Sequence, residues 1–113
     1  MLVTDAMPSV GTSDKSFNLQ GRKITVSGSL CLDEDGRLAG SNIDMASCVR
    51  NAVSLLGLPL PEAVRMASRN PAEFLGLGHE LGRIAPGYRA NLVLADDQLG
   101  VLDTWIDGRS SGA

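Results

Sequence analysis

Met1-Leu2-Val3-Thr4-Asp5-Ala6 is a short apolar run that ends in a carboxylate, and a loop containing Pro8 and Gly11 follows it. A parallel α/β sheet or barrel presents a catalytic acid in this way, because the strand fixes the backbone while its C-terminal end directs the side chain into the site. The alternative is an ordinary exposed aspartate at a strand-to-loop junction, where aspartate is a common turn former. The opening therefore predicts an α/β fold, with Asp5 as a candidate catalytic residue.

Length and composition limit the chain to one small domain or to part of a larger one. Its 113 residues are too few for a complete eight-stranded barrel, which typically takes about 250 residues. The net charge of −3 and the pI near 4.9 argue against nucleic acid or an anionic membrane as a partner. The apolar stretches are too short for a membrane span, and residues 1–10 lack a signal-peptide pattern. These features predict a cytoplasmic protein.

The cysteines and the histidine do not suggest a metal site. Cys31 and Cys48 are too few for a disulfide framework, and both lie in apolar segments, so we expect buried free thiols. The single His79 has no cysteine or histidine at ligand spacing, and we expect it to be an exposed loop or helix-end residue. Asp33-Glu34-Asp35-Gly36 resembles part of a calcium loop, but the first ligand position falls on Cys31, which argues against calcium.

Hydrophobic periodicity predicts strands in the first part of the chain and helices in the middle. Residues 7–21 are expected to be loop, and residues 22–32 alternate as a hairpin or bent strand pair. This alternation places one apolar set on a common face: Ile24, Val26, Leu30 and Leu32. Helices are then expected at about residues 42–56, with Ser41 and Asp44 as a capping box, at 61–68, and from Asn70.

The last third of the chain is predicted to consist of strands and turns. Residues 82–87 are expected to form a short strand with a Pro-Gly turn, and residues 90–95 an apolar strand. Residues 101–106 are expected to form another strand that ends in a turn at Asp107-Gly108, and residues 109–113 to fray.

The segment from residue 70 to residue 108 resembles the C-terminus of the amidohydrolase superfamily. The resemblance rests on these motifs: Asn70-Pro71-Ala72, Leu75-Gly76, Gly82-Arg83-Ile84-Ala85-Pro86-Gly87, Ala90-Asn91-Leu92-Val93 and Asp107-Gly108. The turn needs Gly87 for a positive φ, and the strand at residues 92–94 would contribute to a small β-sandwich packed on a barrel. These motifs are specific to the superfamily as a whole.

The upstream half resembles one family within that superfamily, the N-acetylglucosamine-6-phosphate deacetylases. This narrower resemblance rests on the hairpin and on these segments: Val3-Thr4-Asp5-Ala6, Asp33-Glu34-Asp35-Gly36, Leu38-Ala39-Gly40-Ser41, Val49-Arg50-Asn51 and Arg65-Met66-Ala67. Together the two resemblances extend over residues 2–108. Their most specific part is the combination of the Asp5 strand with the Leu38–Ser41 segment.

The resemblance implies that Asp5 is the catalytic acid/base at the end of the last barrel strand. A divalent metal, zinc or a similar ion, would lower the pKa of a bound water, and Asp5 would take its proton as hydroxide attacks the acetamide carbonyl. Asp5 would then deliver this proton to the leaving amine of the phosphorylated amino sugar. Leu38, Ala39 and Gly40 would line the substrate pocket; the alternative is that they form a plain loop before a helix.

The resemblance also implies an α/β fragment: the last strand and C-terminal helices of a metal-dependent (β/α)8 barrel, with the closing strands of a small β-sandwich. Residues 1–78 would belong to the barrel, with a hairpin insertion at about 16–35, residues 79–108 to the sandwich, and residues 109–113 to a frayed tail. The metal ligands of the family, a glutamate and two histidines, lie on earlier barrel strands. We therefore expect metal in the intact enzyme, and neither metal nor activity in this chain alone.

Two other hypotheses are open. One is that the chain is the tail of another amidohydrolase, such as a cyclic-imide hydrolase or a deaminase, although the hairpin between Asp5 and Leu38 favours the deacetylase. The other is a non-catalytic module that folds and associates by itself. For the isolated chain, an unpaired strand edge at residues 2–4 and an exposed apolar stripe on the helix that carries Val49 predict a homo-oligomer.

Overall fold

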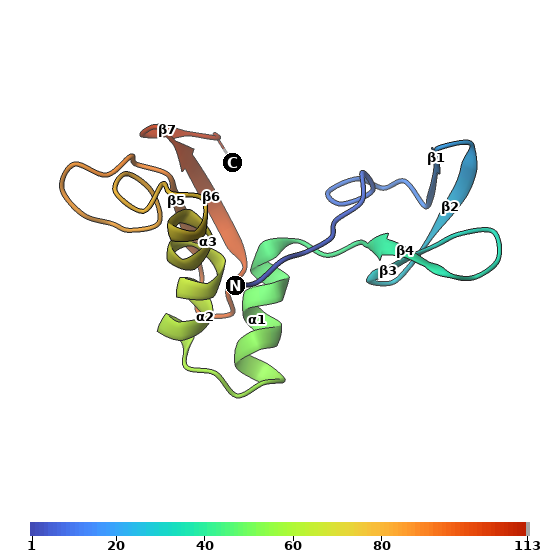
Figure 1. Ribbon diagram of the computed structural model, residues 1–113, viewed down its shortest axis with the longest axis horizontal. Coiled ribbons are helices and arrows are strands. Elements are labelled where there is room, and N and C mark those ends of the chain that lie inside the picture. The colour runs from blue at the N-terminus through green and yellow to red at the C-terminus, as the bar shows by residue number, and fades with distance from the viewer. Residues whose placement is uncertain (113) are drawn as a thin grey trace. The chain divides into compact units, whose positions relative to one another are not determined.

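The computed structural model describes residues 1–112, which divide into two compact units (Figure 1). One unit contains residues 3–48, and the other contains residues 1–2 together with the chain from Val49 onward. Within the described residues, no helix combines the length and the apolar character that crossing a bilayer requires.

The first unit is built on a four-stranded antiparallel sheet in the order β1-β2-β3-β4. Its strands are β1 (Ser16–Leu19), β2 (Arg22–Ser27), β3 (Leu30–Leu32) and β4 (Leu38–Ser41). The predicted hairpin at residues 22–32 is confirmed as β2 and β3. β1 lies in a segment predicted as loop, and no strand was predicted for β4, but both are strands. The alternation in β1 extends over four residues and β4 has none, and both become strands because β2 and β3 offer backbone partners.

The pairing within the hairpin differs from the prediction about which residues share a face of the sheet. Ser27 lies opposite Leu30, so a two-residue turn joins the strands, and Val26 lies opposite Cys31. Directly opposed residues share a face, which puts Cys31 with Val26 and turns Leu30 to the other side. Cys31 is accordingly 0% exposed and Leu30 is 46% exposed. The prediction that Leu30 and Leu32 share a face with Ile24 and Val26 was wrong, because it continued the alternation through the two-residue turn of the predicted hairpin.

The acidic turn between β3 and β4 is held by one of its own carboxylates. Asp33 Oδ1 accepts hydrogen bonds from the backbone N–H groups of Asp35, at 2.9 Å, and Arg37, at 2.8 Å. The bond from Arg37 is the main cause that holds the pKa of Asp33 below its ordinary value. The guanidinium of Arg22 lies 3.2 Å from the other oxygen. The turn therefore returns β4 alongside β3 and uses its carboxylate for structure.

Three helices were predicted, and the structure confirms them as α1 (Met45–Ser54), α2 (Leu60–Ala67) and α3 (Arg69–Phe74). The start of α1 is capped by Asp44, whose Oδ1 accepts a hydrogen bond from the Ser47 N–H at 2.7 Å. Ser41 was expected to share in this cap but lies in β4. The third helix begins at Arg69, and the Nε of Arg69 pairs with Glu73 at 2.7 Å.

The second unit carries a three-stranded antiparallel sheet in the order β5-β6-β7. Its strands are β5 (Leu92–Ala95), β6 (Val101–Ile106) and β7 (Arg109–Ser110). The first two were predicted. The third was expected to fray, but a turn at Asp107-Gly108 returns the chain and Arg109 pairs with Ile106. Residue 113 of that predicted tail lies outside the described residues. The strand predicted at residues 82–87 is bends and turns.

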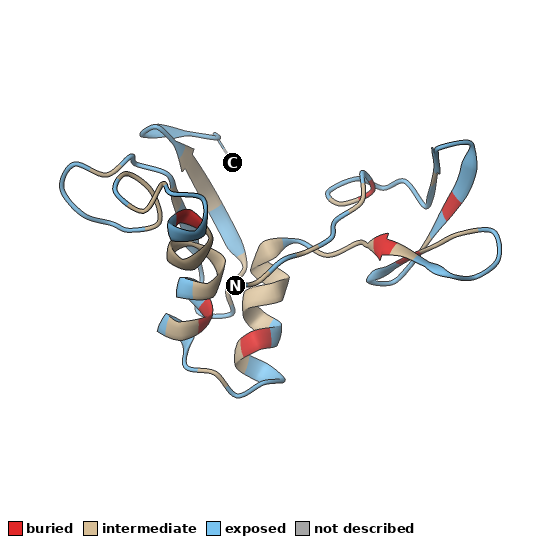
Figure 2. Cartoon of the chain, in the orientation of Figure 1, coloured by how far each residue is buried: buried red, intermediate tan, exposed pale blue. Residues whose placement is uncertain are grey.

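Few residues of the described chain are buried (Figure 2), and most of these have small side chains. The buried apolar residues are Ile24 and Cys31 in the first unit and Ala52, Ala63 and Ala72 in the helices of the second. Large apolar side chains of this unit are exposed, on its helices and strands and in the segments between them, among them Leu55, Leu56, Phe74, Ile84, Val93 and Ile106. The second unit thus presents more apolar surface than its own residues cover.

Gly82 and Gly87 provide a test of close packing in the second unit. Both have a left-handed backbone, with φ of +89° and +85°. A Cβ at Gly82 would lie 2.8 Å from the Cα of Arg69, whereas one at Gly87 would meet no described atom within 4 Å. We predict that Gly87→Ala lowers the free energy of unfolding by about 1–2 kcal/mol, the cost of a left-handed backbone at a residue with a Cβ. Gly82→Ala should lower it by about 2–5 kcal/mol, because its Cβ also collides with α3.

Urea unfolding followed by far-ultraviolet circular dichroism measures both variants. Equal losses for Gly82→Ala and Gly87→Ala would contradict the close approach of this loop to α3.

Candidate functional site

Asp5 lies in a segment that the sequence predicted as a strand. The structure assigns no strand to residues 1–5, and Ala6 makes an isolated parallel bridge with Ser41. A strand needs backbone partners along its length. Within the described residues, Ala6 is the position of this segment that forms a β-bridge, so the segment is not a strand. Asp5 itself is exposed and has a φ of +52°, a conformation that is uncommon for a residue with a side chain.

The backbone on both sides of Asp5 is bonded to the end of β4. The Ser41 N–H donates to the carbonyl of Asp5 at 2.9 Å, and the Met7 N–H donates to the carbonyl of Ser41 at 2.9 Å. The Ser41 hydroxyl donates to the carbonyl of Thr4 at 2.5 Å. A single residue of β4 therefore contacts the chain before, at and after the candidate acid.

The other predicted site residues, Leu38, Ala39 and Gly40, lead directly into that contact, because they form β4 together with Ser41. Leu38 is 68% exposed, whereas Gly40 is buried. A Cβ at Gly40 would lie 2.7 Å from the Cγ and Cε atoms of Met7, so the missing side chain leaves room for Met7 to cross the strand. The structure thus brings the predicted site residues into one region of the first unit, as a strand beside a loop.

A buried polar cluster that sequence reasoning missed anchors the loop after Asp5. Ser9 is 3% exposed; its hydroxyl donates to Oδ1 of Asn42 at 2.9 Å and lies 3.6 Å from the sulfur of Cys31. The amide of Asn42 also donates to the carbonyl of Gly28 at 3.3 Å. No motif distinguishes Ser9 from the other serines nearby, because its burial follows from the pairing of the sheet.

The remaining candidate ligands lie apart from one another in the fold. His79 is exposed in a turn, as predicted. Cys31 is confirmed as a buried free thiol, whereas Cys48 is half-buried; burial raises the pKa of the Cys48 thiol, and the Asp44 carboxylate adds to the effect. Across residues 1–112, no cluster of three or more His, Cys, Asp or Glu side chains is placed to hold a metal ion.

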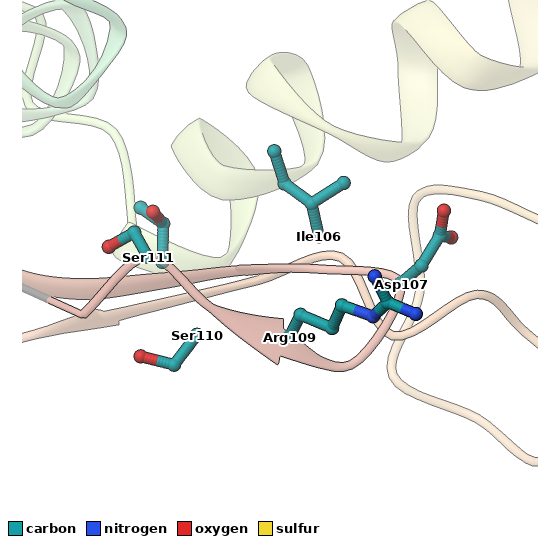
Figure 3. A pocket seen from close by; sticks show the side chains of 6 residues that line it. Ile106, Asp107, Arg109, Ser110 and Ser111 are labelled. Carbon is teal, nitrogen blue, oxygen red and sulfur yellow. The ribbon is translucent and has the colours of Figure 1, made fainter.

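The second unit has a shallow hollow beside β6 and β7 (Figure 3). The residues that line it are Thr104, Ile106, Asp107, Arg109, Ser110 and Ser111. Asp107 accepts two 2.8 Å hydrogen bonds from Arg89, which lower its pKa, and both serine hydroxyls donate to Asp103. These polar groups hold the β6–β7 turn, and none of the predicted site residues lies in the hollow.

Comparisons of the sequence and of the fold with known proteins point to the same family. The Amidohydrolase family matches residues 21–110. An N-acetylgalactosamine-6-phosphate deacetylase of Shewanella sp. is 46% identical over 96% of the chain, and an N-acetylglucosamine-6-phosphate deacetylase of Vibrio furnissii is 33% identical over 96%. The crystal structure of N-acetylglucosamine-6-phosphate deacetylase from Pasteurella multocida is 38% identical and superimposes on 96% of the chain with a TM-score of 0.92.

The chain is much shorter than these proteins. It spans 27% of the Shewanella and Vibrio proteins and 29% of the Pasteurella chain, and it spans 65% of a shorter, 39% identical protein of Escherichia coli K12. The family match nevertheless covers most of the chain, and the fold agrees with that of a solved relative over nearly all of it. The chain therefore belongs to the amidohydrolase family.

Proposed function

We propose that this chain is the C-terminal part of a metal-dependent amidohydrolase that removes the acetyl group from N-acetylglucosamine 6-phosphate, giving glucosamine 6-phosphate and acetate. The observation that carries the proposal is the similarity to sugar-phosphate deacetylases over 96% of the chain. In this proposal residues 1–78 belong to a (β/α)8 barrel and residues 79–108 to a β-sandwich.

In the proposed reaction Asp5 moves one proton. Its carboxylate accepts a proton from the attacking water as the water oxygen bonds to the acetyl carbonyl carbon. When the carbon–nitrogen bond breaks, the same proton passes to the leaving nitrogen, so acetate and the free amine are formed and Asp5 is regenerated. The exposure of Asp5 supports this role, since the carboxylate is open to a substrate.

The metal ligands are proposed to come from polypeptide beyond these residues. A catalytic site of the zinc type takes about three protein ligands, and the described residues contain no cluster that fits this requirement. Leu38, Ala39 and Gly40 are proposed to line the substrate pocket, because β4 runs alongside the backbone of Asp5.

We also propose that the protein is cytoplasmic.

N-acetylgalactosamine 6-phosphate is a second candidate substrate. The relative from Shewanella, which is named for this sugar, is 46% identical to the chain, compared with 33% for the glucosamine-named relative from Vibrio furnissii. The two sugars differ only in the configuration at C4, far from the acetamido group that reacts. The proton transfer by Asp5 is the same for both.

The decisive experiment measures deacetylation of both sugars by a full-length enzyme that carries this chain, with and without Asp5→Asn. The amide has a similar shape but cannot accept the proton, so we predict that kcat falls by about 10²–10⁴-fold while metal content is unchanged. The ratio of kcat/KM for the two sugars then identifies the substrate. Activity of Asp5→Asn within a few-fold of the wild type would rule out the assignment.

Gly40 provides a test of the substrate pocket. We predict that Gly40→Val raises KM for the phosphorylated sugar, because the new side chain collides with Met7 and restricts a backbone at φ +149°. Gly36→Ala is the matched control: its φ is +76°, but a Cβ there would meet no described atom within 4 Å. Unchanged kinetics in a folded Gly40→Val enzyme, or an equal rise in Gly36→Ala, would contradict substrate contact by β4.

We further propose that the chain is a homo-oligomer, because its fold leaves large apolar side chains exposed, such as Leu55, Phe74 and Ile84. Sedimentation velocity of the 113-residue chain is expected to show a dimer or a larger species. Sedimentation as a single monomer at micromolar concentration would contradict this.

A further inference from the structure

Ser41 has an unusual position relative to Asp5. Its N–H, its carbonyl and its hydroxyl each bond to a different residue of the loop that carries Asp5: to the carbonyl of Asp5 at 2.9 Å, the N–H of Met7 at 2.9 Å and the carbonyl of Thr4 at 2.5 Å. Any residue except proline at position 41 would provide the first two bonds through its backbone. The bond to Thr4 requires a hydroxyl, so it depends on the serine side chain.

The backbone of Asp5 needs such support. A φ of +52° is disfavoured for a residue with a Cβ, and it persists where the surroundings determine it. The backbone of Asp5 fixes the position of its Cα and the direction of its Cα–Cβ bond, from which the exposed side chain reaches out. Hydrogen bonds on both sides of Asp5 therefore set the point from which the carboxylate can reach a substrate.

Ser41 is itself held in place by the rest of the sheet. It lies opposite Leu30 in the β3–β4 pair. The next residue, Asn42, donates its N–H to the carbonyl of Ser29 at 2.8 Å and accepts a hydrogen bond from the buried Ser9 at 2.9 Å. The end of β4 is thus bonded to the hairpin on one side and to the loop of Asp5 on the other. It can act as a fixed support for that loop.

We propose that Ser41 is a positioning residue for Asp5: its hydroxyl, bonded to the carbonyl of Thr4, holds the loop so that the Asp5 carboxylate points at the reacting atoms. The proposal rests on the proposed function, because it takes Asp5 as the acid/base. Ser41 itself exchanges no proton with the substrate. Its loss should therefore lower kcat and leave KM for the sugar phosphate nearly unchanged.

The kinetic test uses a full-length deacetylase that carries this chain, with the wild type, Ser41→Ala, Ser41→Thr and Asp5→Asn compared side by side. We expect Ser41→Ala to lower kcat by about 10- to 100-fold with KM within about 2-fold, since small misplacements of a catalytic group have effects of this size. Ser41→Thr keeps the hydroxyl and should stay within about 3-fold of the wild type. Ser27→Ala, at an exposed serine of β2, is the matched control and should have no effect.

A second measurement separates positioning from folding. Hydrogen exchange of the Met7 amide, which bonds to Ser41, should be at least about 10-fold faster in Ser41→Ala, because that bond lies next to the lost one. The amide of Val26, which donates to the carbonyl of Lys15 within the sheet, should exchange at the wild-type rate. Faster exchange at both amides would show a role in folding and would overturn the proposal.

The outcomes distinguish the two levels of inference. If Asp5→Asn is inactive but Ser41→Ala keeps its kcat, or raises KM in place of lowering kcat, the positioning role is overturned and the proposed function stands. A Ser41→Thr enzyme as impaired as Ser41→Ala would also overturn it. If Asp5→Asn retains activity, the assignment of Asp5 fails, and the role of Ser41 fails with it.

Discussion

The hydrogen bonds between Ser41 and the loop around Asp5 are the contact on which the candidate site depends. They join residues far apart in the chain, and they exist because three successive hairpins bring β4 back beside the start of the unit. The turn held by Asp33 completes the last of these hairpins. Without this arrangement Asp5 would be an exposed aspartate in a loop, and Leu38–Gly40 would have no defined position relative to it.

Several carboxylates of the chain hold its backbone or its turns in place. The pKa values of Asp33, Asp103 and Asp107 are lowered by hydrogen bonds, chiefly from the Arg37 backbone, the Ser110 hydroxyl and the Arg89 guanidinium. These three carboxylates hold the ends of neighbouring strands and the turns between them. At Asp5 the hydrogen bonds are made by the backbone, and the side chain is exposed. That difference is what a proton-transfer role would require: the backbone is fixed while the carboxylate is free to meet a substrate.

Local signals in the sequence predicted much of the structure. The three helices were found because their hydrogen bonds form within a few residues and their apolar positions repeat along one face. The hairpin at residues 22–32 and the strands near residues 92 and 101 were found because alternation and turn residues are equally local. Asp5 and the Leu38–Gly40 segment were named as site candidates from their motifs, without any indication of how they meet.

The tertiary structure decided what depends on a partner. β4 and β7 have weak patterns and β1 alternates over only four residues, and all three are strands because a neighbouring strand completes their hydrogen bonds. The two-residue turn of the hairpin decides which residues of β3 face the same side as Val26, and it turns Cys31 to that side, where Cys31 is buried. Ser9 is buried beside the sulfur of Cys31. Periodicity alone could not predict either burial. Ser41 was expected to cap a helix, and pairing with the loop of Asp5 gave it a different role. The sequence by itself thus determined the helices, the regular strands and the candidate residues, whereas only long-range backbone pairing brought those residues together.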